Sequence, residues 1–336
     1  MITVITTIAE PTACVETLIS KIGDTHGLIV IGDKKGPFSY GTDNTQFYSL
    51  EDQFDLDFEL AHKLPMGHYS RKNLGYLLAI RQGEKCIYET DDDNRPNAHW
   101  KVRSKEVKAL RAERADWINA YGHFSRENIW PRGFLLDRIS DPSSRPRHDG
   151  RTKTLSAPIQ QGLADVAPDV DAIWRLTQNR EFSFDRAESL ALPKGAWCPF
   201  NTQSTWWWEE AFPLLYLPSH CSFRMTDIWK SFVAQRCLWE MGHELVFHAP
   251  EVEQDRNVHN LMKDFQAEVP GYLINEKLTS ILEGTKLLSG AGNALENLLR
   301  CYESLVEHKI FPQKEMDLVQ AWAADVLKPS HQKAEL

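Results

Sequence analysis

The sequence predicts an α/β fold in which helices cover a mostly parallel central sheet. Short runs rich in β-branched residues, at 2–8, 28–31 and 85–90, have the composition of buried strands. Residues 11–22 and 70–81, which lie between them, have a helical pattern. A chain that alternates strand and helix usually folds into a parallel sheet, because each helix carries it back to the starting edge. The predicted architecture is a sandwich of the kind that binds nucleotides at the carboxyl ends of its strands.

The N-terminal elements each have a local signal. Ile2–Ile8 is dense in branched side chains, and Pro11 then opens a helix, because proline is tolerated in the first helical turn. The strand Leu28–Ile31 ends in Gly32-Asp33, a turn pair. In the helix predicted from Ser70 to Arg81, leucines recur at the spacing of one buried face.

The C-terminal part predicts a helical appendage. After Glu251 the apolar residues recur at helical spacing, which predicts helices near 251–266, 275–289, 292–308 and 313–327. A further helix is expected from Thr226 to Glu240, whereas residues 140–153 indicate an exposed loop and 195–218 irregular backbone around large side chains. We therefore expect an α/β domain at 1–255, a helical C-terminal region at 256–330 and a tail at 331–336.

Composition restricts the class of protein. The chain has 336 residues and a net charge of −9, which argues against a nucleic-acid partner because such surfaces are basic. The six cysteines form no Cys-x-x-Cys pair, so neither a zinc site nor a disulfide framework is indicated. The N-terminus lacks the pattern of a signal peptide, and no window is apolar enough to span a bilayer. We expect a cytoplasmic protein. It could still act at a membrane surface on a lipid-linked substrate. The sequence does not indicate the oligomeric state.

Asp91-Asp92-Asp93-Asn94 is the most informative stretch of the chain. It follows the predicted strand 85–90, so three carboxylates emerge where a buried strand leaves the sheet. Like charges this close are costly unless a cation neutralises them. Mg²⁺ or Mn²⁺ prefers carboxylate oxygens and can share them with a substrate phosphate. The alternative is a solvated acidic turn, which is common in loops.

Other polar residues lie at the same predicted edge. Thr6 and Thr7 end the first strand and can hold a nucleotide, although threonine is also simply a good strand residue. Asp33 follows the second strand, where it can accept a hydrogen bond from a base or ribose, or cap a turn. Arg71 and Lys72 open a helix, where cations can pair with a diphosphate; the alternative is a solvated surface pair.

These stretches together resemble the STELLO glycosyltransferases, which are similar to the reversibly glycosylated polypeptides, or UDP-arabinopyranose mutases. The resemblance runs in order from residue 2 to about 260, and the helical C-terminus carries no recognised motif. The motifs are Val4-Ile5-Thr6-Thr7-Ile8-x-x-Pro11-Thr12, Ile31-Gly32-Asp33-Lys34-Lys35-x-Pro37, Tyr69-x-Arg71-Lys72-Asn73-Leu74-Gly75-Tyr76, Tyr88-Glu89-Thr90-Asp91-Asp92-Asp93-Asn94, Trp130-Pro131-Arg132-Gly133-Phe134, Asp169-x-Asp171-Ala172, Pro199-Phe200-Asn201-x-Gln203-x-Thr205, Arg224-x-x-Asp227-Ile228-Trp229 and Gln254-x-Arg256-Asn257-x-His259.

The resemblance implies a GT-A-like nucleotide-binding sandwich with a DxD motif and a Mn²⁺ or Mg²⁺ cofactor. It also implies a nucleotide-sugar donor, with UDP as the expected nucleotide. It further implies transfer of the sugar to a glycan or lipid-linked acceptor. In DxD enzymes the last carboxylate usually binds the metal and the first contacts the ribose or a metal-bound water. We therefore assign Asp93 and Asp91 to the metal, Asp91 and Asp92 to the nucleotide-sugar, and leave open which of the three points inward.

Further site residues follow from position and from the resemblance. Asp227, at a predicted helix start, is the expected general base for an inverting transfer, or else an N-cap; Glu209 and Glu210 are weaker alternatives. His248, after an apolar run, could be a third metal ligand or a core histidine, and His259 has similar standing.

Asp171 could contact hydroxyls of the donor sugar. Trp206-Trp207-Trp208 could form a stacking floor for an acceptor sugar, although adjacent residues of a strand face opposite ways, so at least one packs inside. Arg132 matches the position that carries the sugar in the mutase relatives and is counted with the donor-binding residues. Two other functions stay open: a UDP-pentose mutase, and a non-catalytic scaffold on a transferase fold.

Overall fold

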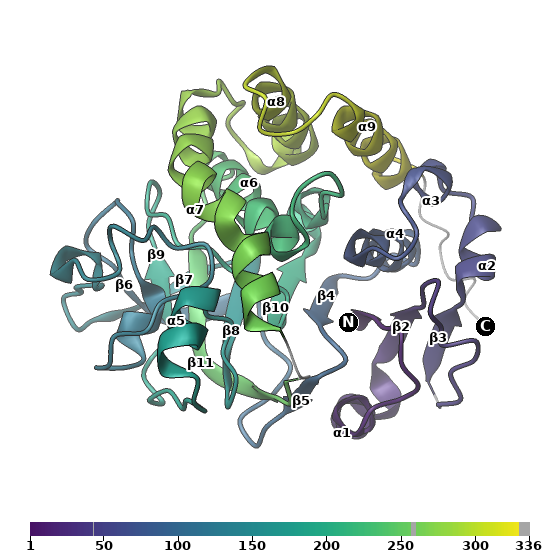
Figure 1. Cartoon of the computed structure of the whole chain (residues 1–336), viewed down its shortest axis with the longest axis horizontal. Coiled ribbons are helices and arrows are strands. Elements are labelled where there is room, and N and C mark those ends of the chain that lie inside the picture. Colours follow the sequence, from purple (N-terminus) through teal and green to yellow (C-terminus); the bar gives the residue numbers. More distant parts are fainter. Residues whose placement is uncertain (43, 257–259, 329–336) are drawn as a thin grey trace.

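The computed structural model describes residues 1–42, 44–256 and 260–328, and it shows an α/β fold built on one large sheet (Figure 1). In the described residues the strands follow the order β3-β2-β1-β4-β10-β8-β11-β9-β6-β7, and β5 pairs with β11. The strands are β1 (Ile2–Thr6), β2 (Gly27–Ile31), β3 (Thr45–Tyr48), β4 (Cys86–Thr90), β5 (Asn94–Pro96), β6 (Glu106–Arg111), β7 (Thr152–Ser156), β8 (Ile159–Asp165), β9 (Leu190–Leu192), β10 (Ser204–Trp208) and β11 (Leu245–Gln254).

Most strands point the same way, which confirms the predicted sheet. β1, β2, β3 and β4 are parallel neighbours. β10 runs antiparallel between β4 and β8, and β11 lies parallel beside β8. The carboxyl ends of β1, β2, β4, β8 and β11 and the amino end of β10 therefore meet at one edge of the sheet. Figure 1 shows the N-terminal strands at the right and β6, β7 and β9 at the left.

Helices cover both faces of the sheet. Alternation along the strands sends Val4 and Trp207 into the main core and Ile5 and Trp206 into a second one. Helix α1 packs on the second core, while α4 and α6 pack on the main one. The helices are α1 (Ala13–Ile22), α2 (Leu50–Phe54), α3 (Glu59–Lys63), α4 (Lys72–Arg81), α5 (Ala172–Gln178), α6 (Thr226–Glu240), α7 (Leu261–Gly284), α8 (Ala294–Glu307) and α9 (Lys314–Val326).

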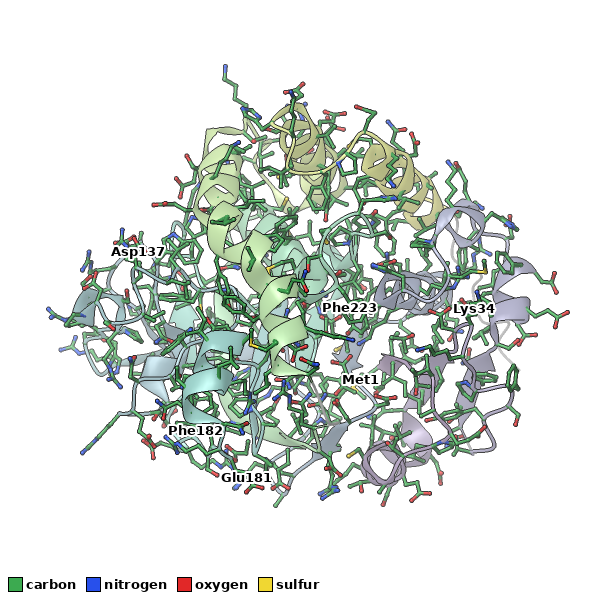
Figure 2. All side chains as sticks on the ribbon, viewed as in Figure 1. Met1, Lys34, Asp137, Glu181, Phe182 and Phe223 are labelled. Carbon is green, nitrogen blue, oxygen red and sulfur yellow. The ribbon has the colours of Figure 1, made fainter. Side chains whose placement is uncertain are left out.

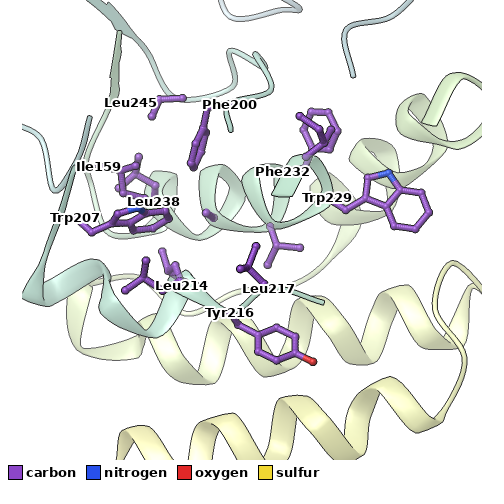
Figure 3. Close-up of a cluster of buried hydrophobic side chains, with 14 of the residues drawn as sticks. Ile159, Phe200, Trp207, Leu214, Tyr216, Leu217, Trp229, Phe232, Leu238 and Leu245 are labelled. Carbon is purple, nitrogen blue, oxygen red and sulfur yellow. The ribbon is translucent and has the colours of Figure 1, made fainter. Parts of the chain in front are cut away.

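Helix α4 lies unusually close to the sheet. A Cβ atom added to Gly75 would stand 2.5 Å from Cγ1 of Val4, so only glycine permits this approach. Helix α6 is enclosed on all sides, because every residue from Thr226 to Trp239 is buried. Figure 3 shows the cluster around α6, with Phe200 and Leu245 on one side and Leu214 and Tyr216 on the other. This packing places the first turns of α4 and α6 near the edge where the strands end.

The helical C-terminal appendage is confirmed. Helices α7, α8 and α9 lie together along one side of the molecule (Figure 1) and share the main core with the sheet. Polar contacts add to this packing: Glu315 accepts backbone hydrogen bonds from Ser219 and His220, and Asp325 from Glu59 and Leu60. The boundary expected between 255 and 256 stays a prediction, and residues 331–336 lie outside the described ranges.

Three predicted segments differ from the structure. Residues 195–218 are not irregular throughout, because they contain β10, a strand in the middle of the sheet. The helices expected at 251–266 and 275–289 are a strand end followed by one helix: β11 continues to Gln254, and α7 runs from Leu261 to Gly284. Pro270 lies inside α7, where sequence patterns favour a break. Within the described ranges, none of the helices combines the length and the apolar character that a membrane crossing requires.

Candidate functional site

Two adjoining cavities open at the edge where the parallel strands end. The larger, the outer cleft, has a volume of about 480 Å³ and lies over the ends of β1 and β2. The smaller, the inner pocket, has a volume of about 100 Å³ and lies toward α6. Asp91 and Gln254 line both cavities and form a shared wall. Asp92 and Asp93, which complete the acidic trio with Asp91, line the outer cleft beside this wall. Phe223, which stacks edge-on against His68 and Tyr69, borders the outer cleft near the middle of the molecule (Figure 2).

The structure brings the whole trio to the outer cleft. Asp91 is held most firmly: its Oδ1 accepts hydrogen bonds from the Tyr69 hydroxyl at 2.6 Å and from Nζ of Lys72 at 2.9 Å. Oδ2 of Asp92 accepts a short hydrogen bond from Thr7. Oδ2 of Asp93 accepts one from the Gln254 amide at 3.0 Å. Donors from the start of α4 and the turn before it, from the end of β1 and from the end of β11 therefore orient the three carboxylates.

Asp93 has a strongly perturbed carboxyl group. Burial, together with the neighbouring charges of Asp91 and Asp92, raises its pKa to about 7. Burial also raises the pKa of Asp92. A dication beside these groups would relieve the repulsion, so the side chains fit Mn²⁺ or Mg²⁺. Within the described ranges, no three His, Cys, Asp or Glu side chains are grouped so as to hold a metal by themselves. Mg²⁺ commonly binds one or two carboxylates and completes its shell with waters and substrate phosphates.

The strand-end residues Thr6, Thr7 and Asp33 line the outer cleft as predicted. Their polar groups are partly committed to the protein. Thr6 donates to the Ile31 carbonyl at 2.9 Å, and Asp33 accepts from the backbone N–H groups of Gly67 and His68 at 2.7 and 2.9 Å. Asp33 therefore holds the loop that forms one wall of the cleft.

The predictions that Arg71 and Lys72 contact a diphosphate are wrong. Arg71 is fully buried away from both cavities and donates to Gln53 at 2.6 Å and to the Leu64 carbonyl. Lys72 is also buried, and its three donors reach the Thr90 carbonyl, Asp91 and the Tyr69 hydroxyl. The helix they open packs against the sheet, which turns both side chains inward. Lys72 acts on the site only by positioning Asp91.

Asp227 lines the inner pocket and forms a buried ion-pair cluster. Both of its oxygens accept from the Arg132 guanidinium, at 3.0 and 2.8 Å, and Asp169 accepts from the other edge of the same group at 2.8 Å. Burial alone would lower the pKa of Arg132, but the two carboxylates outweigh it and hold the pKa above its ordinary value. Each carboxylate oxygen has about two acceptor positions, so Asp227 can still accept a bond from a ligand hydroxyl.

Asp171 does not reach either cavity, so its predicted contact with a sugar is wrong. It is the N-cap of α5: Oδ1 accepts from the Trp174 backbone N–H at 2.8 Å, and Oδ2 accepts from the Trp130 indole at 2.8 Å. Its side chain is fully buried. Burial raises its pKa to about 6.

We expect Asp171→Asn to flatten the pH dependence of stability without affecting ligand binding. The unfolded carboxyl titrates near 3.8 and the folded one near 6, so wild-type stability from this group is full below 3.8 and is lost as pH rises to about 6. Asparagine is a good N-cap and carries no charge. Urea unfolding at pH 4 and pH 7 should show a smaller loss in the variant, by about 2–3 kcal/mol. Equal losses in both proteins would contradict the assignment.

His248 is not a metal ligand. It is 1% exposed, and its ring nitrogens contact the Ser189 hydroxyl at 2.7 Å and the Gln160 amide oxygen at 2.9 Å. Gln254, which touches Asp93, lies six residues further along β11, roughly 20 Å away at the rise of a strand. Burial lowers the pKa of His248 well below its ordinary value, as expected for a neutral core histidine. His259 lies outside the described residues.

The tryptophan triplet does not form an acceptor floor. Trp206 and Trp207 are fully buried on opposite faces of β10: Trp206 stacks with Tyr88 and Trp100, and the Trp207 indole donates to Glu89 at 2.8 Å. Because successive side chains of a strand point to opposite faces of the sheet, Trp206 and Trp207 enter two different cores and cannot form one surface. Glu209 and Glu210, just beyond β10, form ion pairs with Lys85 and Lys105 and do not line either cavity.

Several residues of the cavities were not predicted from the sequence as site residues. Tyr69 and Gln254 orient the trio, and Asp169, Arg224 and Arg256 line the inner pocket. All five stand inside the motifs quoted above, so the motifs were the available signal. Arg175 also lines the pocket, but no motif contained it.

Comparison with known proteins agrees with this geometry. A family model described as STELLO glycosyltransferases matches residues 224–335, which include Asp227 and the C-terminal helices. The helical C-terminus, which carried no recognised motif, is thus part of the family pattern.

Two Arabidopsis thaliana proteins, the probable glycosyltransferases STELLO1 and STELLO2, are 25% and 26% identical over 331 residues. These matches cover 92% of the chain but only 42% of each relative, so the chain spans less than half of their length. The family model and the two relatives agree, and the chain is similar to the STELLO glycosyltransferases.

Proposed function

We propose that the protein is a metal-dependent, inverting glycosyltransferase that uses a nucleoside diphosphate sugar, with UDP as the preferred nucleotide. The acceptor would be a glycan or a lipid-linked sugar. The observation that carries the proposal is the acidic trio in the outer cleft, where Asp91 also lines the inner pocket and so forms part of the wall between the two cavities. A diphosphate at this wall would extend its nucleoside into the cleft and its sugar toward Asp227.

The outer cleft suits a nucleoside. Its volume of about 480 Å³ lies within the range of small-molecule sites, roughly 300–1,000 Å³. Ile8 and Phe223 leave apolar surface exposed at its rim, with exposed fractions of 55% and 58%. These side chains offer surfaces against which a base can stack, and the carboxylate of Asp33 and the hydroxyl of Thr6 offer polar contacts beside them.

Asp91 and Asp93 are the residues that would hold Mn²⁺ or Mg²⁺. The bound ion would neutralise the charge that develops on the departing diphosphate. The described residues do not offer a complete set of metal ligands. The two carboxylates therefore suit an ion whose coordination shell is completed by oxygens of the diphosphate.

Asp227 is the proposed general base. In an inverting transfer the acceptor oxygen bonds to the anomeric carbon while the bond from that carbon to the diphosphate oxygen breaks, and the diphosphate leaves with the electron pair. The acceptor hydroxyl gives its proton to Asp227. The bidentate contact with Arg132 fixes the orientation of the carboxylate in the inner pocket.

The mutase alternative has less support from the structure. In the mutase relatives the position matched by Arg132 carries the sugar, whereas here Arg132 donates to two carboxylates and to the Arg224 carbonyl. A guanidinium engaged in this way has no free nitrogen with which to attack a sugar. Donor incubated with protein alone and resolved by chromatography would separate the two functions, because only a mutase interconverts the ring forms.

Asp93→Asn should abolish metal-dependent binding of UDP. With wild-type protein we expect UDP and Mn²⁺ together to raise Tm by several degrees, since a ligand at 100 times its Kd stabilises by about 2.7 kcal/mol. Either component alone should give little shift, because each completes the other's site. In the variant the combined shift should disappear while Tm without ligand is unchanged or higher.

Asp137→Asn is the matched control, because Asp137 is exposed and distant from the site (Figure 2). It should retain the full shift. Equal stabilisation of the Asp93 variant and the wild-type protein would remove Asp93 from the site, and the absence of any shift in the wild-type protein would overturn the proposed function.

A further inference from the structure

The inner pocket contains more positive charge than a neutral sugar requires. Four arginines line it: Arg132, Arg175, Arg224 and Arg256. Their side chains come from separate parts of the chain, so the fold gathers them. Carboxylates of the protein form ion pairs with three of the four, which leaves one to explain.

The three compensated arginines form ion pairs. Arg132 pairs with Asp169 and Asp227. Arg224 pairs with Glu268 at 2.8 Å, and Arg256 pairs with Asp264 at 3.1 Å. These pairs fix the walls of the pocket and hold the arginine side chains in one arrangement.

Arg175 has no such partner. It is 5% exposed, and its Nη2 donates to the Pro168 carbonyl at 2.6 Å while the guanidinium lies 5.5 Å from the Trp174 ring centre. No carboxylate of the described residues forms an ion pair with it. Burial and the charge of Arg256 lower the pKa of Arg175 to about 10, while the charge of Asp169, which is not in ion-pair contact with it, acts in the opposite direction. Arg175 therefore stays charged at neutral pH. A buried charge without a partner is costly, so its position in a pocket wall points to an anionic ligand.

We propose that the inner pocket binds a carboxylate or phosphate group that enters on the transferred sugar or on the acceptor, and that Arg175 pairs with this group. This inference rests on the proposed function, which places the sugar end of the donor on the pocket side of Asp91. The pocket volume of about 100 Å³ corresponds to roughly three water molecules, which suits one such group. The planar guanidinium can bind either anion through two parallel hydrogen bonds.

The test compares ligand pairs that differ by one charge. Titration calorimetry with Mn²⁺ would measure the affinities of UDP, UDP-glucose and UDP-glucuronate for wild-type protein, Arg175→Gln and Arg175→Lys. A second arm would titrate glycerol phosphate into protein saturated with UDP and Mn²⁺. If the anion is on the donor, wild-type protein should prefer UDP-glucuronate to UDP-glucose by about 10- to 100-fold. If it is on the acceptor, glycerol phosphate should bind instead.

The variant that removes the charge should abolish the preference in whichever arm shows it. Arg175→Gln should leave the affinity for UDP unchanged, and Arg175→Lys should retain part of the preference. Arg111→Gln is the matched control, because Arg111 pairs with Glu244 at the opposite edge of the sheet and should behave as wild type. If Arg175→Gln does not fold, Arg256→Gln in the same wall should weaken the same arm.

Three results would overturn the inference. One is that wild-type protein shows neither a preference for UDP-glucuronate nor binding of glycerol phosphate. Another is that Arg175→Gln retains the preference. The last is that Arg175→Gln weakens UDP as much as UDP-glucuronate, which would make Arg175 a diphosphate contact. If wild-type protein binds no UDP at all, the proposed function fails separately, and glycerol phosphate titrated without nucleotide then decides the inference.

Discussion

Replacing Lys230 by methionine should destabilise the protein by about 3–5 kcal/mol, because it leaves Glu89 as an unpaired charge in the core. Lys230 of α6 contacts both oxygens of Glu89 at 2.8 and 3.0 Å, and both side chains are buried. Glu89 lies on β4, directly before Thr90 and the trio. The loss of folding stability in Lys230→Met should appear as a lower midpoint of urea unfolding.

A double variant separates the ion pair from packing. Glu89→Gln combined with Lys230→Met removes both charges, and the amide can still interact with the Tyr76 hydroxyl and the Trp207 indole that contact Glu89. We expect the double variant to unfold at a higher urea concentration than Lys230→Met alone. An unchanged midpoint in Lys230→Met would show that the pair contributes nothing measurable.

Asp227→Asn should lower turnover by about 10²- to 10⁴-fold while UDP still binds, because the amide cannot take the proton of the acceptor hydroxyl. Release of UDP from the preferred donor would measure turnover, and calorimetry would measure binding. The amide oxygen can still accept from Arg132, so the pocket should keep its shape.

Asp169→Asn is the comparison that isolates the chemical role of Asp227. Asp169 makes an equivalent pair of bonds to Arg132, so its replacement reports the cost of loosening that arginine. The loss in Asp227→Asn should be the larger by at least about tenfold, given the contribution expected of a general base. Equal losses, or full activity in Asp227→Asn, would dismiss Asp227 as the base.

Local sequence patterns predicted five elements of the first 90 residues well. β1, β2, β4, α1 and α4 lie within two residues of their expected bounds, whereas β3, α2 and α3 were not predicted. The same reasoning failed at β11, where residues 251–254 extend a strand that the apolar spacing assigned to a helix. Pairing with β5 and β8 stabilises those residues as a strand, and such partners are remote in sequence.

The positions of the candidate site residues were also predicted only in part. Position at a strand end placed Thr6, Thr7, Asp33 and the acidic trio at the outer cleft, because the carboxyl ends of parallel strands must meet. Position at a helix start suggested a phosphate contact for Arg71, yet the packing of α4 against the sheet buries it. Nothing local distinguishes a helix start that faces a cavity from one that faces the core.

The sequence by itself determined the α/β class, the acidic edge and the resemblance to the STELLO glycosyltransferases, because strand and helix periodicities and short motifs are local properties of the chain. Only the tertiary structure decided that His248 and Asp171 are structural, that Lys72 positions Asp91, and that a pocket contains Arg175 without a carboxylate partner in the described residues. The reason is physical: the exposure and charge environment of a side chain depend on elements that are distant in sequence and adjacent only after packing.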